Sequence, residues 1–159
     1  MSTQRITTSL WFDTQAVEAA EFYCSIFEDS RIVSVADYPA GTDNAGTPMV
    51  VEWDMLGQRF TAINGGPQFP FTEAISLAIE CVDQDEIDRY WALLTDGGEE
   101  GVCGWCKDRF GLSWQVRPAH MNRFYTGDPE AAARTAQAMF GMRKLDIAGL
   151  EAAASATVA

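Results

Sequence analysis

The sequence predicts an α+β fold in which one βαβββ module occurs twice, at residues 5–64 and 74–117, within a single domain spanning 1–159. One observation is that a series of strand-like and helix-like segments restarts after the break NGGP at 64–67. A second is that the chain has 159 residues, 47% of them hydrophobic, enough for one ordinary domain with its own core. We therefore expect two similar modules that together enclose one concave pocket.

Internal similarity supports the repeat. A shift of 68 residues places Phe22-Tyr23 on Tyr90-Trp91. A shift of 54 residues aligns the later parts of the copies: Gly57 with Gly111, Phe60 with Trp114 and Ala62 with Val116. The smaller shift indicates that the second copy has lost residues from its middle strands.

The first copy begins at 6–12, where β-branched and aromatic residues predict a strand. Asp13 or Thr14 is expected to cap a following helix, because both side chains accept hydrogen bonds from free backbone N–H groups. The apolar positions of this helix are Val17, Ala20, Phe22 or Tyr23, Cys24 and Phe27. Three more strands are predicted at 31–38, 48–55 and 59–64, with a loop at 40–46 and a tight hairpin turn at 56–58.

The second copy begins with a predicted buried strand at 74–81. Asp83 can cap the next helix, and Glu86 three residues later completes a capping box. The helix ends at the glycine pair 97–98, and short strands follow near 99–106 and 112–117.

A helical tail is predicted at 128–152. Asp128 followed by proline starts a helix over 129–143, and a second short helix is expected near 145–152. A terminal amphipathic helix either covers a sheet or packs against a partner subunit.

Composition excludes several classes of function. The chain carries 23 acidic and 11 basic residues, a net charge of −12, which argues against nucleic-acid binding. No apolar run approaches the roughly 20 residues that a membrane helix needs, and the N-terminus does not resemble a signal peptide. We therefore expect a cytoplasmic protein with neither a nucleic-acid nor a membrane partner.

Four cysteines are present. Cys24 and Cys81 lie in apolar stretches and are expected in the core. Cys103 and Cys106 have the CxxC spacing of a redox pair, but the long helix that follows such a pair in thioredoxin-like proteins is not predicted here. We favour two unrelated thiols.

Four segments resemble PhnB-like proteins: LWFDTQAVEAAEFYCSIF at 10–27, AINGGPQFPFTEAISL at 62–77, EEGVCGWCKDRFGLSWQV at 99–116 and DPEAAARTAQAMFGMRKLDIAGLE at 128–151. That family belongs to the vicinal oxygen chelate superfamily, with the glyoxalase I, bleomycin-resistance and extradiol dioxygenase groups. The resemblance implies paired βαβββ modules that form an open curved sheet, and a homodimer. It does not imply a reaction, because the superfamily includes isomerases, dioxygenases and pure binding proteins.

The resemblance also locates the positions of a metal site. Catalytic members of the superfamily bind a divalent ion through residues, usually His and Glu, on the first and last strand of each module. The equivalent positions here are Thr7, Thr61, a residue near Ile75, and Gln115. None of these side chains is a normal ligand for zinc, nickel or iron, so we expect no metal and no other cofactor.

Other ligand sets are weaker candidates. The only histidine, His120, lies outside the strands and is expected at the surface. Glu52 and Asp54 share one face of a strand and could bind magnesium, although a polar strand face is the simpler interpretation. A set of Glu52, Asp54 and Gln115 would support the alternative hypothesis of a metal-dependent lyase, isomerase or dioxygenase.

Strand alternation predicts the residues that line the pocket. Thr7, Ser9 and Trp11 should face the cavity, with Ile6, Thr8, Leu10 and Phe12 under a helix. In the last strand, Ser113 and Gln115 should face the cavity, with Leu112, Trp114 and Val116 on the helix side. The complete set of pocket candidates is Thr7, Ser9, Trp11, Thr61, Asn64, Ser113 and Gln115.

Two of these residues keep alternative interpretations. Trp11 is either an aromatic pocket wall or ordinary core packing. Gln115 either orients a carbonyl or carboxamide ligand or is satisfied by a neighbouring backbone group. The charged turn at 107–109 could steer an anion, but a mixed-charge surface turn is the usual explanation.

Members of the PhnB-like family, which this sequence resembles, are often labelled demethylubiquinone methyltransferase-like. The common S-adenosylmethionine fold needs a strand, a glycine-rich loop and a helix early in the chain, and no such arrangement is predicted here. We favour a metal-free protein that binds a small organic molecule. An enzyme with an atypical metal set and an assembly module with an occluded cavity are the alternatives.

Overall fold

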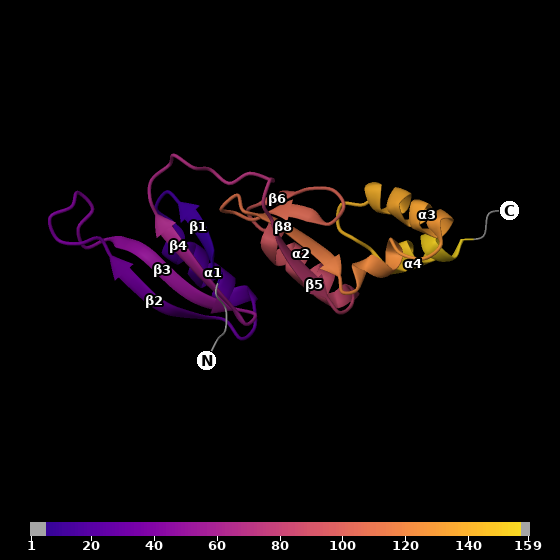
Figure 1. The fold of residues 1–159 in the computed structure, drawn as a ribbon, viewed down its shortest axis with the longest axis horizontal. Coiled ribbons are helices and arrows are strands. Elements are labelled where there is room, and N and C mark those ends of the chain that lie inside the picture. Colours follow the sequence, from indigo (N-terminus) through magenta and orange to yellow (C-terminus); the bar gives the residue numbers. More distant parts are fainter. Residues whose placement is uncertain (1–5, 157–159) are drawn as a thin grey trace. The chain divides into compact units, whose positions relative to one another are not determined.

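The structure, a computed structural model, describes residues 6–156. The chain divides into two compact units (Figure 1): unit 1 ends at Phe71 and unit 2 begins at Thr72. Each predicted module lies within one of these units. That the two modules fold as one domain with a shared pocket stays a prediction.

Unit 1 is a four-stranded mixed sheet with one helix. Its elements are β1 (Thr8–Phe12), α1 (Ala16–Ile26), β2 (Arg31–Asp37), β3 (Pro48–Met55) and β4 (Gln58–Asn64). The strand order is β1-β4-β3-β2, with β1 parallel to β4 and the other pairs antiparallel (Figure 1).

Unit 2 repeats this topology. Its elements are β5 (Leu77–Cys81), α2 (Gln84–Thr95), β6 (Glu99–Glu100), β7 (Trp105–Lys107) and β8 (Ser113–Pro118), followed by a 3-10 turn η1 (Met121–Phe124), α3 (Pro129–Phe140) and α4 (Ile147–Ser155). The strand order is β5-β8-β7-β6, with β5 parallel to β8. The predicted α+β fold, with two βαβββ modules and C-terminal helices, is confirmed.

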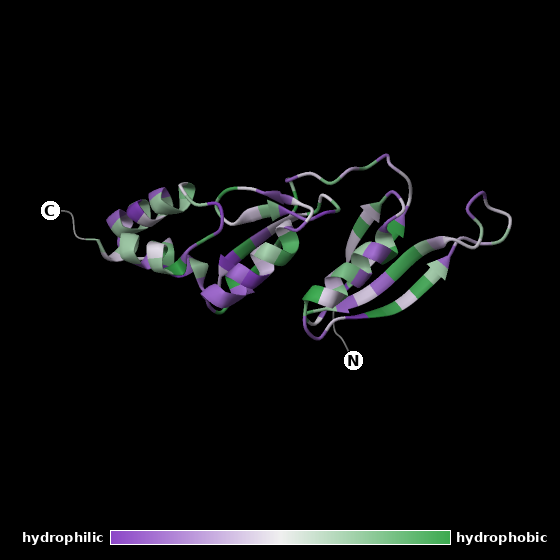
Figure 2. Ribbon diagram, turned by 180° about the vertical axis from the view of Figure 1, so that it is seen from behind, coloured by the Kyte–Doolittle hydropathy of each residue, from purple (hydrophilic) through white to green (hydrophobic). Residues whose placement is uncertain are grey.

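The core of unit 1 lies between α1 and one face of its sheet. Trp53 of β3 is fully buried and stacks with Tyr23 of α1, with ring centroids 6.1 Å apart, and with Phe60 of β4, 5.4 Å away. The alternate residues therefore lie on the opposite face, which we call the open face. Burial alternates along most of β3 and β4, as the period of two requires, and Figure 2 shows both strands coloured by hydropathy.

Two strand boundaries differ from the prediction. β1 begins at Thr8, and Ile6, predicted to lie under a helix, is 87% exposed. β5 begins at Leu77 rather than at residue 74. The predicted hairpin turn is confirmed, because Leu56 and Gly57 both have positive φ, 47° and 78°, as a two-residue turn of the type I′ family requires.

The two module helices differ in how their N-termini are capped. The cap of α2 by Asp83 is confirmed, because the Glu86 N–H donates to Asp83 Oδ1 at 2.9 Å. The Glu86 carboxylate reaches back as in a capping box, but it accepts from the N–H of Val82, one residue before the cap, at 2.8 Å. The predicted cap of α1 by Asp13 or Thr14 is wrong, because Gln15 occupies the cap position without a side-chain bond. The stripe of α1 also differs in detail, since Cys24 is only half-buried.

The helical tail packs within unit 2. Its core is a cluster of Met121, Phe124, Leu145 and Leu150. Gln84, at the start of α2, donates to the Leu145 carbonyl at 3.1 Å and accepts from the Ile147 N–H at 2.9 Å. No helix within residues 6–156 is long and apolar enough to cross a membrane.

Candidate functional site

The open face of the first sheet is polar at its centre. Pairing of the four strands brings Ser9, Thr61, Glu52 and Ser34 into one row across the sheet. Thr7 lies just before β1 and is exposed. Of the pocket candidates predicted in this unit, Ser9 and Thr61 are therefore neighbours.

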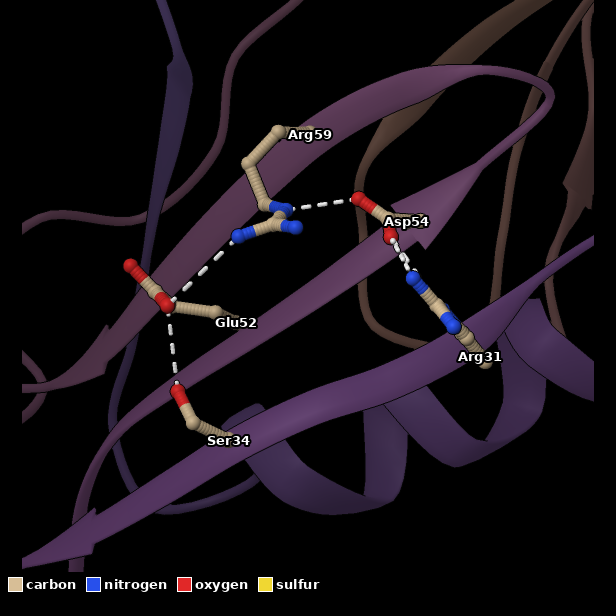
Figure 3. Close-up of polar contacts among 5 residues, drawn as sticks. All are labelled: Arg31, Ser34, Glu52, Asp54 and Arg59. Atoms are coloured by element: carbon tan, nitrogen blue, oxygen red, sulfur yellow. Dashed lines mark hydrogen bonds and ion pairs between the residues drawn. The ribbon is translucent and has the colours of Figure 1, made fainter. Parts of the chain in front are cut away.

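Ion pairs occupy much of this face (Figure 3). Arg59 Nε donates to Asp54 Oδ1 at 2.6 Å, and Arg31 Nη2 lies 3.2 Å from Asp54 Oδ2. Glu52 Oε2 accepts from Ser34 Oγ at 3.1 Å and lies 3.7 Å from Arg59 Nη1. The hydrogen bond from Arg59, followed by that from Arg31, lowers the pKa of Asp54. Both carboxylates of the magnesium hypothesis thus have arginine neighbours.

Trp11 is covered by the chain that follows β4. Its indole N–H donates to the Gly66 carbonyl at 2.8 Å, and its ring meets Phe69 edge-on at 5.0 Å. A Cβ on Gly65 would lie 2.1 Å from the Trp11 ring, so only glycine permits this approach. The ring therefore packs within unit 1, and its donor is already used.

Asn64 is on the other face of β4 from Thr61. It is buried, its Oδ1 accepts from the Ala16 N–H at 2.8 Å, and its Nδ2 donates to the Pro48 carbonyl at 3.0 Å. The helix-capping bond that Asp13 and Thr14 were predicted to make comes instead from Asn64. Among the pocket candidates, the structure thus separates Asn64 from the open face.

The open face of the second sheet contains both remaining candidates. Ser113 and Gln115 alternate with the buried Trp114 and Val116 along β8, as predicted. Gln115 Nε2 donates to Ser76 Oγ at 2.8 Å. The partner of Gln115 is thus a side chain, not the backbone group considered from the sequence.

Strand pairing also corrects one predicted position. Thr8 pairs with Phe60 in unit 1, and Leu77 pairs with Trp114 in unit 2. Since Phe60 corresponds to Trp114 in the repeat, Thr7 corresponds to Ser76. The residue predicted near Ile75 is therefore best matched by Ser76, and Ile75 itself is 72% exposed.

A hollow of about 140 Å³ lies in unit 2, beside Ser113. Its wall includes Glu73, Glu99, Trp105 and Lys107. Lys107 and Ser113 are paired across β7 and β8, and Glu99 pairs with Lys107 across β6 and β7. The hollow thus opens on the open face of the second sheet.

Two features of the hollow matter chemically. Lys107 Nζ lies 2.6 Å from a Glu73 carboxylate oxygen, and this contact raises the pKa of Lys107 and lowers that of Glu73. Ser113 is 1% exposed, and its Oγ has no hydrogen-bond partner among residues 6–156. A buried hydroxyl without a partner is uncommon and calls for an explanation.

Comparisons with known proteins identify the family. The family model described as 3-demethylubiquinone-9 3-methyltransferase matches residues 4–117. The structure of a PhnB protein from Bacillus cereus is 34% identical, covering 73% of this chain and 100% of that chain, with a TM-score of 0.67. The chain belongs to the PhnB-like family. It thereby belongs to the vicinal oxygen chelate superfamily, as the resemblance implied.

More distant structures share the fold of this PhnB-like chain. Protein PA1353 from Pseudomonas aeruginosa is 19% identical over 74% of this chain and 99% of that chain, with a TM-score of 0.62. A mutant of the fosfomycin resistance protein FosX from Listeria monocytogenes, complexed with Mn(II) and 1S,2S-dihydroxypropylphosphonic acid, is 10% identical over 79% of this chain and 100% of that chain, with a TM-score of 0.58. No protein with curated function matches.

The four positions that the resemblance matches to the superfamily metal site do not hold the usual donors. The equivalent positions hold Thr7, Thr61, Ser76 and Gln115, which are three hydroxyls and an amide. Within the described part of the chain, no three His, Cys, Asp or Glu side chains are placed to hold a metal ion. These residues do not fit a divalent metal that needs imidazole or carboxylate ligands.

The other motifs of the PhnB-like chain have structural explanations. Cys106 is buried, which raises its pKa to about 12, whereas Cys103 lies in the loop before β7 with φ of 57°. His120 is exposed, as predicted. Asp108 is not a surface charge: it is 2% exposed and accepts hydrogen bonds from the Phe110 and Leu112 N–H groups and the Trp114 indole.

The connection between β1 and α1 is also informative. It runs through residues 13–15, Asp-Thr-Gln, without a glycine. A glycine-rich loop for S-adenosylmethionine, which the sequence did not predict, is absent from this connection.

Proposed function

We propose that this PhnB-like protein binds a small organic molecule in the hollow of unit 2, without a classical metal centre. The observation that carries the proposal is the buried, unpartnered hydroxyl of Ser113 beside a hollow with an aromatic wall at Trp105. Binding sites combine apolar and aromatic walls with a few placed polar groups, and this hollow has that composition. Its volume of about 140 Å³ is similar to that of a cavity that accepts benzene.

The alternative is a metal-dependent lyase, isomerase or dioxygenase that uses Glu52, Asp54 and Gln115. The first two side chains are next to arginine guanidinium groups, and the amide of Gln115 is bonded to Ser76. These contacts favour the metal-free proposal. Elemental analysis of protein purified without chelator or added metal tests it: one equivalent of a transition metal that is lost on Gln115→Ala would support the alternative.

The binding test is a fragment screen by ligand-observed NMR on the full chain, with probes of up to about ten non-hydrogen atoms because the hollow is small. Binding should weaken on Trp105→Leu, which removes the aromatic wall. Phe140→Leu is a matched control, because Phe140 is 68% exposed on α3 and is not part of the hollow. Equal binding by both variants and the wild type would place the ligand elsewhere. No binding at all would support the occluded assembly module.

We also propose a cytoplasmic homodimer. Four free thiols suit a reducing compartment. Strand β2 forms an edge of its sheet with Val33 41% and Val35 45% exposed, and exposed edge strands are commonly covered in native assemblies. Light scattering during size-exclusion chromatography would give twice the mass of one chain, and a monomer at micromolar concentration would contradict the proposal.

A further inference from the structure

The charges around the hollow are unequal. Its wall contains three carboxylates, Glu73, Glu99 and Glu100, and one ammonium group, Lys107. Lys107 is already paired with Glu73 at 2.6 Å. Two carboxylates therefore remain after this pair is counted.

The two remaining carboxylates differ in their surroundings. Glu100 Oε1 accepts from the Trp91 indole of α2 at 3.1 Å, so this carboxylate faces the helix side of the sheet. Glu99 pairs with Lys107 across β6 and β7 and so has its side chain on the open face. Its charge contributes to the raised pKa of Lys107, but among residues 6–156 the short ion pair of Lys107 is with Glu73, not with Glu99. Glu99 is thus the carboxylate available to a ligand.

Trp105 is a second group on the wall of the hollow that attracts cations. Its side chain shares the open face with that of Lys107, because the two residues are two apart on β7. Gly101 keeps the backbone close, since a Cβ there would lie 2.6 Å from the Trp105 carbonyl oxygen. A tryptophan ring attracts cations over its face more strongly than other aromatic rings do.

We propose that the hollow takes a small organic cation, such as a primary ammonium group attached to a small apolar group. This inference rests on the proposed function and names its ligand class. The ammonium group would lie near Glu99 with the apolar part against Trp105. An N–H of the ligand would donate to Ser113 Oγ once the neighbouring Lys107 side chain shifts, because that hydroxyl is buried. An anion would have to displace Glu73 from Lys107 and would then lie near Glu99.

Arg143 also lies near Glu100. Its guanidinium donates to the Glu100 carbonyl oxygen at 3.0 Å, and its side chain is not part of the wall. Together with the whole-chain net charge of −12, the local excess of carboxylates favours a cationic over an anionic ligand.

The test compares three probes of one size: benzylammonium, benzyl alcohol and benzoate. Their affinities for the full chain at pH 7 are measured by NMR titration, following the Trp105 indole resonance. Benzylammonium should bind most tightly, and its affinity should fall as sodium chloride is raised. Glu99→Gln should weaken benzylammonium about twofold to fivefold, the range of an exposed ion pair, and leave benzyl alcohol unchanged. Glu21→Gln, the same change at an exposed position on α1 of unit 1, is the matched control.

Each outcome decides between the two proposals. Tighter binding of benzoate, or equal binding of benzylammonium and benzyl alcohol at every salt concentration, overturns the cation class and leaves small-molecule binding intact. If Glu99→Gln does not fold, the salt titration of the wild type gives the same decision. If none of the three probes binds, the charge of the hits in the fragment screen decides, and a screen without hits overturns both proposals.

Discussion

Replacing Ser113 by alanine should stabilise the free protein. The Ser113 side chain is 1% exposed, and its hydroxyl has no partner within residues 6–156. A buried hydroxyl without a hydrogen bond costs about 1–3 kcal/mol relative to its hydrated state. Alanine keeps the Cβ and removes only the oxygen, so the void is small. We expect Ser113→Ala to raise the free energy of unfolding by about 1 kcal/mol.

Thr135 provides the matched control. It is also 1% exposed, but its Oγ1 donates to the Ala131 carbonyl at 2.9 Å. Thr135→Val removes this satisfied hydroxyl at constant shape and should lower the free energy of unfolding by about 1 kcal/mol. The two substitutions each delete one hydroxyl that is 1% exposed in unit 2, unpartnered on strand β8 in one case and hydrogen-bonded on helix α3 in the other.

The assay is urea unfolding at pH 7, followed by far-ultraviolet circular dichroism. With a slope of about 2 kcal/mol per molar urea, the midpoint should rise by about 0.5 M for Ser113→Ala and fall by a similar amount for Thr135→Val. A lower midpoint for Ser113→Ala at unchanged slope would refute the reasoning, because it would mean that the hydroxyl is hydrogen-bonded in solution. If Ser113 serves a ligand, the same variant should be more stable and bind benzylammonium more weakly, a trade that is common at binding sites.

Three further predictions concern other parts of the chain. Asn64→Ala should lower the free energy of unfolding by about 1–2 kcal/mol, because it removes the hydrogen-bond acceptor at the start of α1. It should leave the affinity for benzylammonium unchanged, and weaker binding would show that Asn64 contributes to the ligand site. The pKa of Asp54 is lowered in the folded state, so its ion pairs stabilise the fold above the unfolded pKa of about 3.9, and this stabilisation is lost as pH falls through the folded pKa. Asp54→Asn should therefore lose less stability than the wild type when pH falls below about 4. The same dependence of unfolding free energy on pH in both proteins would contradict the ion pair. Cys81 and Cys106, whose pKa values burial raises to about 12, should resist a thiol reagent at pH 8 until the protein unfolds, whereas Cys103 should react in the native state; reversible loss of two thiols on mild oxidation, without crosslinked dimers, would instead indicate a Cys103–Cys106 redox pair.

Local patterns in the sequence predicted most of the fold. The alternation in β8 correctly assigned Trp114 and Val116 to the helix side, because a strand with one covered face must repeat every two residues. The cap at Asp83 and the Asp-Pro start at Asp128 were also correct, since these capping bonds join residues at most three apart. At Leu56 the hairpin was correct for the same reason.

Tertiary contacts caused the errors. Asn64 serves α1 from 48 residues away, so no local pattern could show that its amide is used. The equivalence of Thr7 and Ser76 depends on strand pairing, so the sequence could place this position only near Ile75. Asp108 was read as a surface charge because its three donors become visible only when the turn before β8 is folded.

The two modules share one topology but use the polar groups of their open faces differently. In unit 1, Glu52 and Asp54 are held by Arg59 and its neighbours, so formation of the sheet itself satisfies these charges. In unit 2, the hydroxyl of Ser113 is left without a partner in the described chain, beside a hollow. On its open face the first copy pairs both carboxylates, whereas the second leaves Ser113 Oγ and Arg117 Nε without a partner among residues 6–156, a cost that packing alone does not explain. The unpartnered indole N–H of Trp53 in unit 1 belongs to the core face instead. We therefore expect the second sheet to be the one that binds a ligand.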